Sequence, residues 1–550
     1  MQISDSRARL LAFDFGTGGL TVGLFNPHDN RMEGFGGASY GNLTGLADPN
    51  WKEQDPRDWI AAIPVAMKEL RKATKFEANT VVGIGIGGHM HALVVLGSDD
   101  QPVLAGGGVG RPAPSAGRPA PSAGRPAPSA GKLLSGAIMW DDPRGEKEGR
   151  KLSKELGEPI AARMTASRVR WFAANHPDAW KKTVQRVCVP STFVALELTG
   201  EFGVGPGEGS GMFGQLDRKG RFGNDKLDTI DRELRKRTPK VGAAGEVLGR
   251  LNARGAELLG LPEGVPVAYP EGDQPIGMVA SGCIDGRASI SLGNSVVFNA
   301  VGSQPMLKKR GLVDSFRTAD NRHLLMTCMT SGCVVYDELV DCFLDCAQWL
   351  SQKASKDDIR NWLTSEAAKV PAGCDGVLAL PFYKGEGVFK QPTAFASFLG
   401  FRDRKRSASG EVTSDSAALK AGVLARASLE ATSLTLRVGF SEMGLKSLDQ
   451  IVVSGGGSRN TLWPQIIADV FGVPVAKPQN ADEAATRGAA YLALLMARRE
   501  AGDKIELAEL LSQYVELTNR VEPNSDHTKL YKKLLPKFVK SLGRLTPLYA

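Results

Sequence analysis

The chain of 550 residues has the composition of an average globular protein, with 42% hydrophobic and 23% charged residues. This length and balance exclude a disulfide-stapled miniprotein and a wholly disordered or fibrous chain, and they predict two or more folded domains. Lys and Arg number 68 against 60 Asp and Glu, so the formal net charge is +8. The basic runs lack the interleaved aromatic residues of a nucleic-acid surface, so no nucleic-acid partner is expected.

The seven cysteines do not form the paired C-x-x-C pattern of structural zinc, which predicts reduced thiols in the core. The N-terminus lacks the apolar core of a signal peptide, and no apolar run is long enough to cross a bilayer. We therefore expect a cytoplasmic protein without a membrane partner.

Short β-branched or apolar runs alternate with helical stretches along the chain, which predicts an α/β fold. In chain order, the predicted strands cover residues 10–15, 81–86, 92–96, 137–140, 288–292 and 451–454. One predicted helix covers residues 419–443. A second begins near Asp482, where Asn480 and Glu483 resemble a capping box ahead of apolar residues at helical spacing.

A low-complexity segment interrupts the first half of the chain. The sequence RPAPSAG occurs three times in succession over residues 111–131. Pro and small residues cannot bury enough surface to offset the entropy of ordering, so this segment is expected to be an exposed, extended or disordered loop within a domain. A proline-rich docking site is the functional alternative, but the identity of the three copies favours a neutral insertion.

The strand-turn-strand sequence FDFGTGGLTVGLF, residues 13–25, recurs in form as ISLGNSVVFNA, residues 290–300. Two copies of one α/β unit would explain both this echo and the length of the chain. A third glycine turn, SGGG at residues 454–457, follows the apolar run IVV. Such turns can aim backbone N–H groups at a phosphate, although each one alone is also compatible with a simple hairpin.

Two aspartates lie in apolar or turn sequences where a buried carboxylate would need a cation or hydrogen-bond donors. Asp14 lies in an apolar strand directly before the first glycine turn, where Mg²⁺ shared with a polyphosphate would satisfy it; the alternative is an Asp that caps its own turn. Asp273 follows a glycine and precedes Pro275, so it is either the N-cap of a helix or a catalytic base directed by the helix start. The sequence leaves both alternatives open.

Two further clusters are typical of sugar contacts. Residues 87–91, GGHMH, end an apolar strand and offer two imidazoles and a thioether. Because no third metal ligand is identifiable, sugar hydroxyls are favoured over a metal ion. Residues 140–144, WDDPR, combine a stacking surface with carboxylates and a guanidinium; a core Trp beside a surface ion pair is the alternative.

Together these motifs resemble the FGGY family of carbohydrate kinases, and within that family they are most similar to the xylulokinases. The matching segments, which span nearly the whole chain, are FDFGTGG, WKEQDPRDW, GIGIGGHMHALVVL, AIMWDDPR, LTGEF, GDQP, SLGNS, SGGGSRN, WPQIIADVFGVPV and RGAAYLA. The resemblance implies an α/β fold of two actin-like, ribonuclease-H-like domains with an interdomain cleft. Residues 1–282 would bind the sugar, and residues 283–550 would bind ATP.

The resemblance also implies roles for individual residues. Asp273 would be the catalytic base that accepts the proton of the sugar hydroxyl as that oxygen attacks the γ-phosphate of ATP. The implied sugar contacts are Met90, His91, Trp140, Asp142, Arg144 and Gln274. The implied ATP contacts are Gly16, Thr17, Gly18, Gly293, Asn294, Ser295, Gly455, Gly456, Gly457 and Asn460, with Mg²⁺ at Asp14.

The implied reaction is the ATP-dependent phosphorylation of a ketose, D-xylulose to D-xylulose 5-phosphate. The alternatives are another ketose or polyol, such as sedoheptulose or ribulose, and a catalytically silent protein that binds sugar or nucleotide. The sequence departs from the family pattern at Thr21, at Asn294 and across residues 381–392. The expected partners are a small-molecule sugar and ATP, with a homodimer as the expected assembly.

Overall fold

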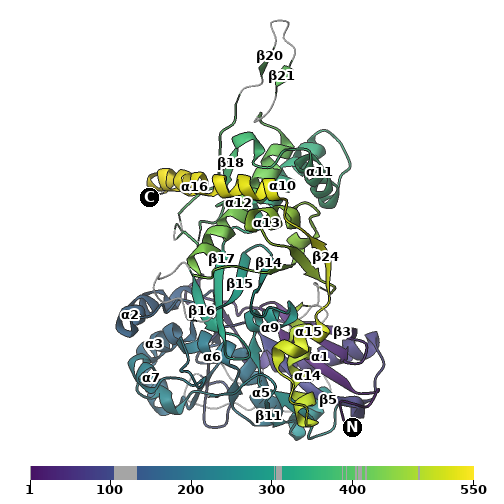
Figure 1. Cartoon of the computed structure of the whole chain (residues 1–550). Coiled ribbons are helices and arrows are strands. Elements are labelled where there is room, and N and C mark those ends of the chain that lie inside the picture. Colours follow the sequence, from purple (N-terminus) through teal and green to yellow (C-terminus); the bar gives the residue numbers. More distant parts are fainter. Residues whose placement is uncertain are drawn as a thin grey trace. The chain divides into compact units, whose positions relative to one another are not determined.

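The computed structural model describes residues 2–104, 133–302, 304, 313–386, 388–389, 391, 393–402, 405–406, 412–414, 418–480 and 484–549 (Figure 1). The RPAPSAG repeat and the predicted capping residue Glu483 lie outside these residues. The chain forms two compact units. The first comprises Met1–Gly282, Phe316–Leu324 and Glu483–Tyr514, and the second comprises Cys283–Ser315, Leu325–Asp482 and Val515–Ala550. Two segments that follow residue 282 in sequence, 316–324 and 483–514, pack into the first unit.

The first unit is built on a seven-stranded sheet in the order β11-β12-β5-β1-β2-β3, with β13 paired to β5. Its strands are β1 (Arg9–Phe15), β2 (Gly19–Asn26), β3 (Arg31–Ser39), β5 (Val81–Gly88), β11 (Val247–Arg250), β12 (Pro266–Ala268) and β13 (Glu271–Gly272). β1 is antiparallel to β2 and parallel to β5, and β13 is parallel to β5. The carboxyl ends of β1, β5 and β13 therefore meet at one edge of the sheet.

Helices from distant parts of the sequence pack on this sheet. α1 (Pro56–Ala73) contacts β2 and β3, whereas α14 (Ala484–Glu500) contacts β1, β5 and α9 (Asp273–Ala280). Figure 1 shows α14 in yellow beside the purple N-terminal strands. Gly85 permits this contact, because a Cβ on Gly85 would lie 2.0 Å from the Ala489 carbonyl oxygen.

The rest of the first unit forms small sheets and helices. The small sheets pair β4 (Glu53–Gln54) with β7 (Ala137–Ile138), β6 (Val94–Leu96) with β8 (Arg186–Cys188), and β9 (Gly203–Val204) with β10 (Lys240–Val241). The helices are α2 (Glu146–Leu156), α3 (Thr165–Asn175), α4 (Pro177–Lys182), α5 (Pro190–Thr199), α6 (Pro206–Phe213), α7 (Asn224–Ile230), α8 (Ala253–Leu259) and α15 (Leu507–Tyr514). Helices α2, α3, α4, α6 and α7 surround a second apolar core, whereas α5 and α8 pack against the core of the large sheet.

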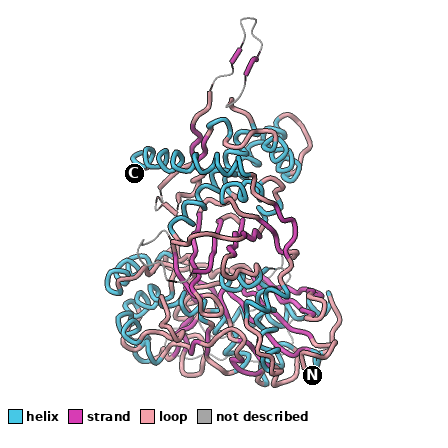
Figure 2. The backbone as a smooth tube through the Cα atoms, in the orientation of Figure 1, coloured by secondary structure: helices cyan, strands magenta, loops and turns pink. Residues whose placement is uncertain are grey.

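The second unit repeats the central arrangement of the first. Its sheet has the order β16-β17-β15-β14-β22-β23-β24, and β14 is antiparallel to β15 and parallel to β22. The strands of both sheets can be followed in Figure 2. The strands are β14 (Arg287–Leu292), β15 (Val296–Gly302), β16 (Asp314–Arg317), β17 (His323–Met329), β22 (Gln450–Ser454), β23 (Val475–Pro478) and β24 (Leu517–Val521). The set β14, β15 and β22 corresponds to β1, β2 and β5, which confirms the internal echo.

Five helices and two hairpins complete the described part of the second unit. The helices are α10 (Val334–Trp349), α11 (Lys356–Ala368), α12 (Ala421–Glu442), α13 (Trp463–Phe471) and α16 (Ser525–Leu545), and the hairpins pair β18 (Leu378–Leu380) with β19 (Ser397–Leu399) and β20 (Lys405–Arg406) with β21 (Val412–Ser414). α12 is the central helix. Its buried Glu430 accepts hydrogen bonds from Arg426 and from Tyr531 of α16, both at 2.7 Å.

The predicted elements agree with these bounds, with two shortened strands. Of the predicted strand 92–96, only β6 (Val94–Leu96) forms, and of the predicted strand 137–140, only β7 (Ala137–Ile138) forms. The prediction of core thiols is wrong for Cys342 and Cys346, which are exposed on α10.

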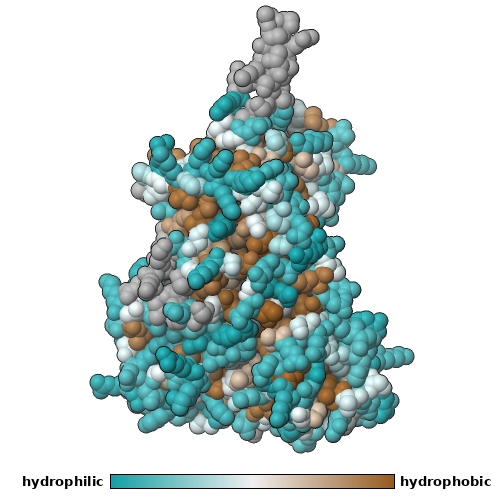
Figure 3. Space-filling model, in the orientation of Figure 1, coloured by the Kyte–Doolittle hydropathy of each residue, from teal (hydrophilic) through white to brown (hydrophobic). Residues whose placement is uncertain are grey.

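The face seen in Figure 3 is mostly hydrophilic. In the described part of the chain, no helix combines the length and hydropathy needed to cross a membrane.

The contact between β5 and α14 yields a test of the fold. Gly85→Ala should destabilise the first unit by about 1–3 kcal/mol, because the new methyl group has to displace the backbone of α14. Gly543→Ala in α16 is the control: no atom lies within 4 Å of the added Cβ, so helix propensity should stabilise this variant by up to about 1 kcal/mol. Chemical denaturation measures both changes, and equal effects would contradict the packing.

Candidate functional site

Two acidic residues, Asp14 and Asp273, lie at the strand ends of the first unit. Asp14 in β1 pairs in register with Gly87 of β5, and Gly87 pairs with Glu271 of β13. Asp273 follows β13 directly and is the first residue of α9. Burial raises the pKa of Asp14 to about 6. Burial and the nearby charge of Asp14 raise the pKa of Asp273 to about 7, although hydrogen bonds from Gln274 oppose this rise.

The start of α9 decides between the two roles that the sequence left open for Asp273. The N-cap residue of this helix is Gly272, and Asp273 occupies the first helical position. The carboxylate of Asp273 instead accepts hydrogen bonds from the backbone and the side chain of Gln274. The helix-cap interpretation is therefore wrong, and Asp273 remains a partly buried carboxylate whose pKa is raised to about 7.

The first glycine turn joins β1 to β2 and carries Thr17 and Gly18 at the surface. The Gly16 N–H donates to the Gly19 carbonyl at 2.9 Å. The Tyr40 hydroxyl donates to the Gly16 carbonyl, and the Gln54 side chain donates to the Thr17 carbonyl, both at 2.7 Å. These bonds fix the turn beside the two carboxylates.

The two histidines of the GGHMH cluster have different surroundings. His89 is 3% exposed, and its Nδ1 contacts the Phe15 carbonyl at 2.9 Å. Its ring lies edge-on to Trp59, with the centroids 5.6 Å apart, and burial lowers its pKa to about 4. His89 is therefore a neutral core residue. Among the described residues, no group of three or more His, Cys, Asp or Glu side chains could hold a metal ion.

His91 adopts a left-handed backbone conformation, with φ at +73°, which costs a non-glycine residue on the order of 1–3 kcal/mol. Three hydrogen bonds hold it there. Its N–H donates to Glu208 Oε1 at 3.0 Å, its carbonyl accepts from the Thr165 hydroxyl at 3.0 Å, and its Nδ1 lies 3.0 Å from the Gly211 carbonyl. Burial, with the charges of Arg163 and Arg168, lowers the pKa of His91 well below its usual value.

Because a carbonyl only accepts, the Nδ1 of His91 must carry the proton, and the neutral ring presents Nε2 as an acceptor. Such a nitrogen can accept a hydrogen bond from a hydroxyl group. Met90, the other predicted contact, is 4% exposed and lies close to Gly211 and Gly272, where an added Cβ would stand 2.7 and 2.4 Å from its side chain.

Trp140 remains accessible. It is 41% exposed, and its indole N–H donates to the Thr17 hydroxyl at 3.2 Å. Its carbonyl accepts from the fully buried Arg168 at 2.6 Å. The exposed ring is thereby fixed next to the first glycine turn, where it can stack on a ligand.

Asp142 and Arg144 form a buried network with other protein groups. The Asp142 carboxylate accepts two hydrogen bonds from the Arg144 guanidinium, at 2.7 and 2.8 Å, and one from the Lys52 N–H at 2.7 Å. Arg144 also donates to Glu53 at 2.7 Å, and its guanidinium contacts the rings of Trp51 and Trp171. The surface ion pair considered in the sequence analysis is therefore a buried one, and it supports the loop that carries Trp140.

Several residues around the strand ends had no predicted role. Glu271 is 1% exposed and accepts from the backbone N–H groups of Gly207 and Glu208, at 3.0 and 2.8 Å. Burial raises its pKa to about 7. The signal for this region was present in the glycines at alternate positions 205, 207, 209 and 211. Glycine is unfavourable inside a helix, so this spacing indicates the close approach of another segment.

The second unit brings two glycine turns side by side. Residues Gly293–Ser295 join β14 to β15, and Gly455–Gly457 follow β22. Gly455 has a φ of +79°, and an added Cβ would lie 2.8 Å from the Leu292 carbonyl oxygen, next to the first of these turns. The Cys333 N–H donates to the Gly293 carbonyl at 3.0 Å. Asn294 and Ser295 are exposed at the tip.

Asn460 has a structural position in the second unit. Its side-chain oxygen accepts from the N–H groups of Leu462 and Trp463, at 2.9 and 3.0 Å, at the start of α13. Its amide donates to the Thr364 hydroxyl at 3.1 Å. Both polar atoms of this side chain thus have protein partners.

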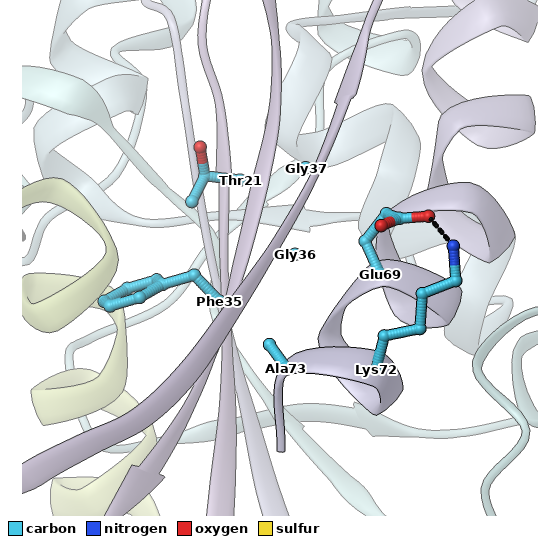
Figure 4. A pocket seen from close by; sticks show the side chains of 7 residues that line it. All are labelled: Thr21, Phe35, Gly36, Gly37, Glu69, Lys72 and Ala73. Carbon is cyan, nitrogen blue, oxygen red and sulfur yellow. Dashed lines mark hydrogen bonds and ion pairs between the residues drawn. The ribbon is translucent and has the colours of Figure 1, made fainter.

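A surface pocket of about 590 Å³ lies between the edge of the first sheet and α1 (Figure 4). It is lined by Thr21, Phe35, Gly36, Gly37, Glu69, Lys72 and Ala73. Glu69 and Lys72 pair with each other at 2.8 Å. None of the predicted site residues lines this pocket. The carboxylates with raised pKa values mark the strand ends as the candidate active site instead.

The buried network predicts that Arg144 contributes to the stability of the fold. Arg144→Met should cost about 3–5 kcal/mol of stability, because Glu53 and Asp142 would lose their buried cation. Arg150→Met is the control: its pair with Glu146 is exposed, so the change should stay within about 0.5 kcal/mol. Urea unfolding measures both values. Unchanged stability with loss of sugar binding would instead make Arg144 a direct ligand contact.

Both units of the chain match the domains of a known protein family. The N-terminal domain of the FGGY family of carbohydrate kinases matches residues 9–105 and 129–280, and the C-terminal domain of that family matches residues 288–497. The xylulose kinase of Haemophilus influenzae is 27% identical over an alignment of 557 positions. The alignment covers 97% of this chain and 99% of that protein.

Solved structures share the fold. A xyloylose kinase from Brucella ovis has a TM-score of 0.78 at 22% identity and covers 98% of this chain and 100% of its own. A gluconate kinase from Lactobacillus acidophilus has a TM-score of 0.76 at 17% identity, with 98% and 99% covered. The predicted fold class, two actin-like, ribonuclease-H-like domains, is confirmed. The chain is a phosphotransferase that belongs to the FGGY family of carbohydrate kinases.

Proposed function

We propose that this carbohydrate kinase transfers the γ-phosphoryl group of ATP to D-xylulose and forms D-xylulose 5-phosphate. The choice of sugar is supported by the names of the relatives, which include the xylulose kinase of Haemophilus influenzae. The chemistry is supported above all by one observation, the partly buried Asp273 at the start of α9. Its raised pKa, about 7, suits a general base that works near neutral pH.

In this proposal Asp273 accepts the proton of the sugar hydroxyl while the oxygen attacks the γ-phosphorus. The bond between the γ-phosphorus and the bridging oxygen breaks, and ADP leaves. His91 accepts a hydrogen bond from another hydroxyl through Nε2, Gln274 contacts the sugar next to Asp273, and Met90 and the Trp140 ring form the apolar surfaces. Asp142 and Arg144 act indirectly, by fixing the Trp140 loop.

Asp14 is the residue that would hold Mg²⁺. Its oxygens are the hard ligands that this ion prefers, and a site with one carboxylate, completed by phosphate and water, is typical of Mg²⁺. When bound, Mg²⁺ supplies positive charge that neutralises the transferring phosphate. Thr17 and the glycines Gly16 and Gly18 would then face the phosphates from the same turn.

The adjacent turns of the second unit are the proposed ATP site. Gly293, Asn294 and Ser295 would contact the phosphates through backbone and side-chain donors, and the glycines at 455–457 would allow the nucleotide to approach the backbone closely. Asn460 contributes by fixing the start of α13. Homodimer formation stays a prediction, which light scattering of the purified protein can check.

The substrate is tested with a panel of sugars in a coupled assay of ADP release. We expect the largest kcat/KM for D-xylulose among D-xylulose, D-ribulose, sedoheptulose, gluconate and glycerol. A larger kcat/KM for another sugar of the panel would identify that sugar as the substrate and leave the kinase mechanism in place. Release of ADP with none of these sugars above the sugar-free rate would contradict the proposal.

The base is tested by Asp273→Asn. Turnover should fall by about a hundredfold or more, because Asn cannot accept the proton. The melting temperature at pH 8 should be retained or raised, since the cap is Gly272 and the substitution removes a partly buried charge that Asp14 repels. Asp178→Asn on the surface of α4 is the control and should leave turnover unchanged. Near-normal turnover in the Asp273 variant would remove this residue from catalysis.

A further inference from the structure

Glu208 is a buried acid that lies between the two proposed functional groups of the first unit. It belongs to α6, is 0% exposed, and its Oε1 accepts the His91 N–H at 3.0 Å. Its Oε2 lies against the backbone before Asp273, since a Cβ added to Gly272 would stand 2.3 Å from this oxygen. One carboxyl group therefore touches both the His91 loop and the start of α9.

The surroundings of Glu208 favour its uncharged form. No Lys or Arg pairs with it in the described part of the chain, and Oε2 has no hydrogen-bond partner there. The ionisable groups that face it are the acids Asp273 and Glu271, while the neutral His91 offers only its backbone N–H. A buried carboxylate without a cation is costly, so the proton is assigned to Oε2. Burial and the neighbouring acids raise the pKa of Glu208 well above its usual value.

Helix α6 is built to bring this carboxyl group close. A Cβ on Gly211 would lie 2.8 Å from the His91 ring, and a Cβ on Gly205 would lie 2.3 Å from the Glu271 carboxylate. Glu271 in turn binds the N–H groups of Gly207 and Glu208 at the first turn of α6. The glycines and Glu271 thus fix the helix, and the helix fixes Glu208.

We infer that Glu208, in its uncharged form, is a positioning residue for the sugar, which holds His91 in its left-handed conformation next to Asp273. This inference rests on the proposed sugar contact of His91. The hydrogen bond from the His91 N–H helps to keep the ring oriented, so that Nε2 meets a sugar hydroxyl. The absence of charge matters because a carboxylate at this place would add to the charge of Asp14 and raise the pKa of Asp273 further.

The test compares two substitutions at Glu208. Glu208→Leu removes the acceptor and should raise the KM for D-xylulose by about tenfold or more, with the KM for ATP unchanged. Glu208→Gln keeps an acceptor of the same shape without charge, and should recover most of the lost affinity. Glu197→Leu is the matched control, a buried acid of α5 that binds Gln101 and Arg254 and should leave the KM for D-xylulose unchanged.

Two further readouts separate positioning from general damage. Hydrogen exchange of the His91 amide should speed up in Glu208→Leu and stay slow in Glu208→Gln. The acid limb of the kcat/KM profile should not move in Glu208→Gln, whereas removal of a real negative charge would lower its apparent pKa by about one unit or more. The exchange measurement needs no sugar, so it decides the His91 contact even if the enzyme proves inactive on D-xylulose.

Three results would overturn the inference. These are an unchanged KM for D-xylulose in Glu208→Leu, an equal rise in Glu197→Leu, and a loss in Glu208→Gln as large as that in Glu208→Leu. If Glu208→Leu does not fold, Glu208→Gln decides alone. In Glu208→Gln, slow exchange of the His91 amide, a near-normal KM for D-xylulose and an unchanged apparent pKa of the acid limb would support the inference. A shift in that apparent pKa, or fast exchange of the His91 amide, would refute it.

Discussion

Four carboxyl groups crowd at and beside the carboxyl ends of β1, β5 and β13, without a basic side chain among the described groups that act on them. Asp14, Asp273, Glu271 and Glu208 are therefore all held at raised pKa values. In water such acids would ionise near pH 4. Burial raises the pKa of all four, and nearby acids raise it further for Asp273, Glu208 and Glu271, so one of these acids can take up a proton near neutral pH.

The carboxyl groups can lie this close because three neighbouring positions are glycines. A side chain at Gly272 would collide with Glu208, one at Gly211 with the His91 ring, and one at Gly205 with Glu271. Backbone N–H groups and Gln274, in place of cations, partly satisfy the carboxylates. Such partners orient a carboxylate without neutralising it fully. The buried cation Arg144 belongs to a separate network, in which Glu53 and Asp142 neutralise it.

Local sequence patterns could predict the strands, the glycine turns and the two aspartates. An aspartate before a glycine turn or a helix start is visible in the chain, and the structure places both at the ends of β1 and β13, the two strands that flank β5. The sequence could not decide between helix cap and buried acid for Asp273, because the cap depends on the backbone angles of Gly272. It also could not tell that Asp142 and Arg144 bind each other and Glu53, a partner 91 residues from Arg144.

Long-range packing explains the other omissions. Segments 316–324 and 483–514 join the first unit although they follow residue 282 in sequence. Phe316 reaches the ring of His91, with the centroids 5.6 Å apart, and no local pattern encodes this contact. Glu208 was missed for the same reason. Only the alternate glycines of its helix gave a sign that another segment approaches there.

The ionisation of Asp273 in the intact protein is the most direct test of its role as the base. Infrared difference spectra between the wild type and Asp273→Asn, recorded across a pH series without ligands, isolate the carboxylate stretch of this residue. If Asp273 is the base, the carboxylate band should appear with a midpoint at about pH 7. A midpoint near pH 4, the value of an exposed aspartate, would contradict the partly buried base, repelled by Asp14, on which the mechanism depends.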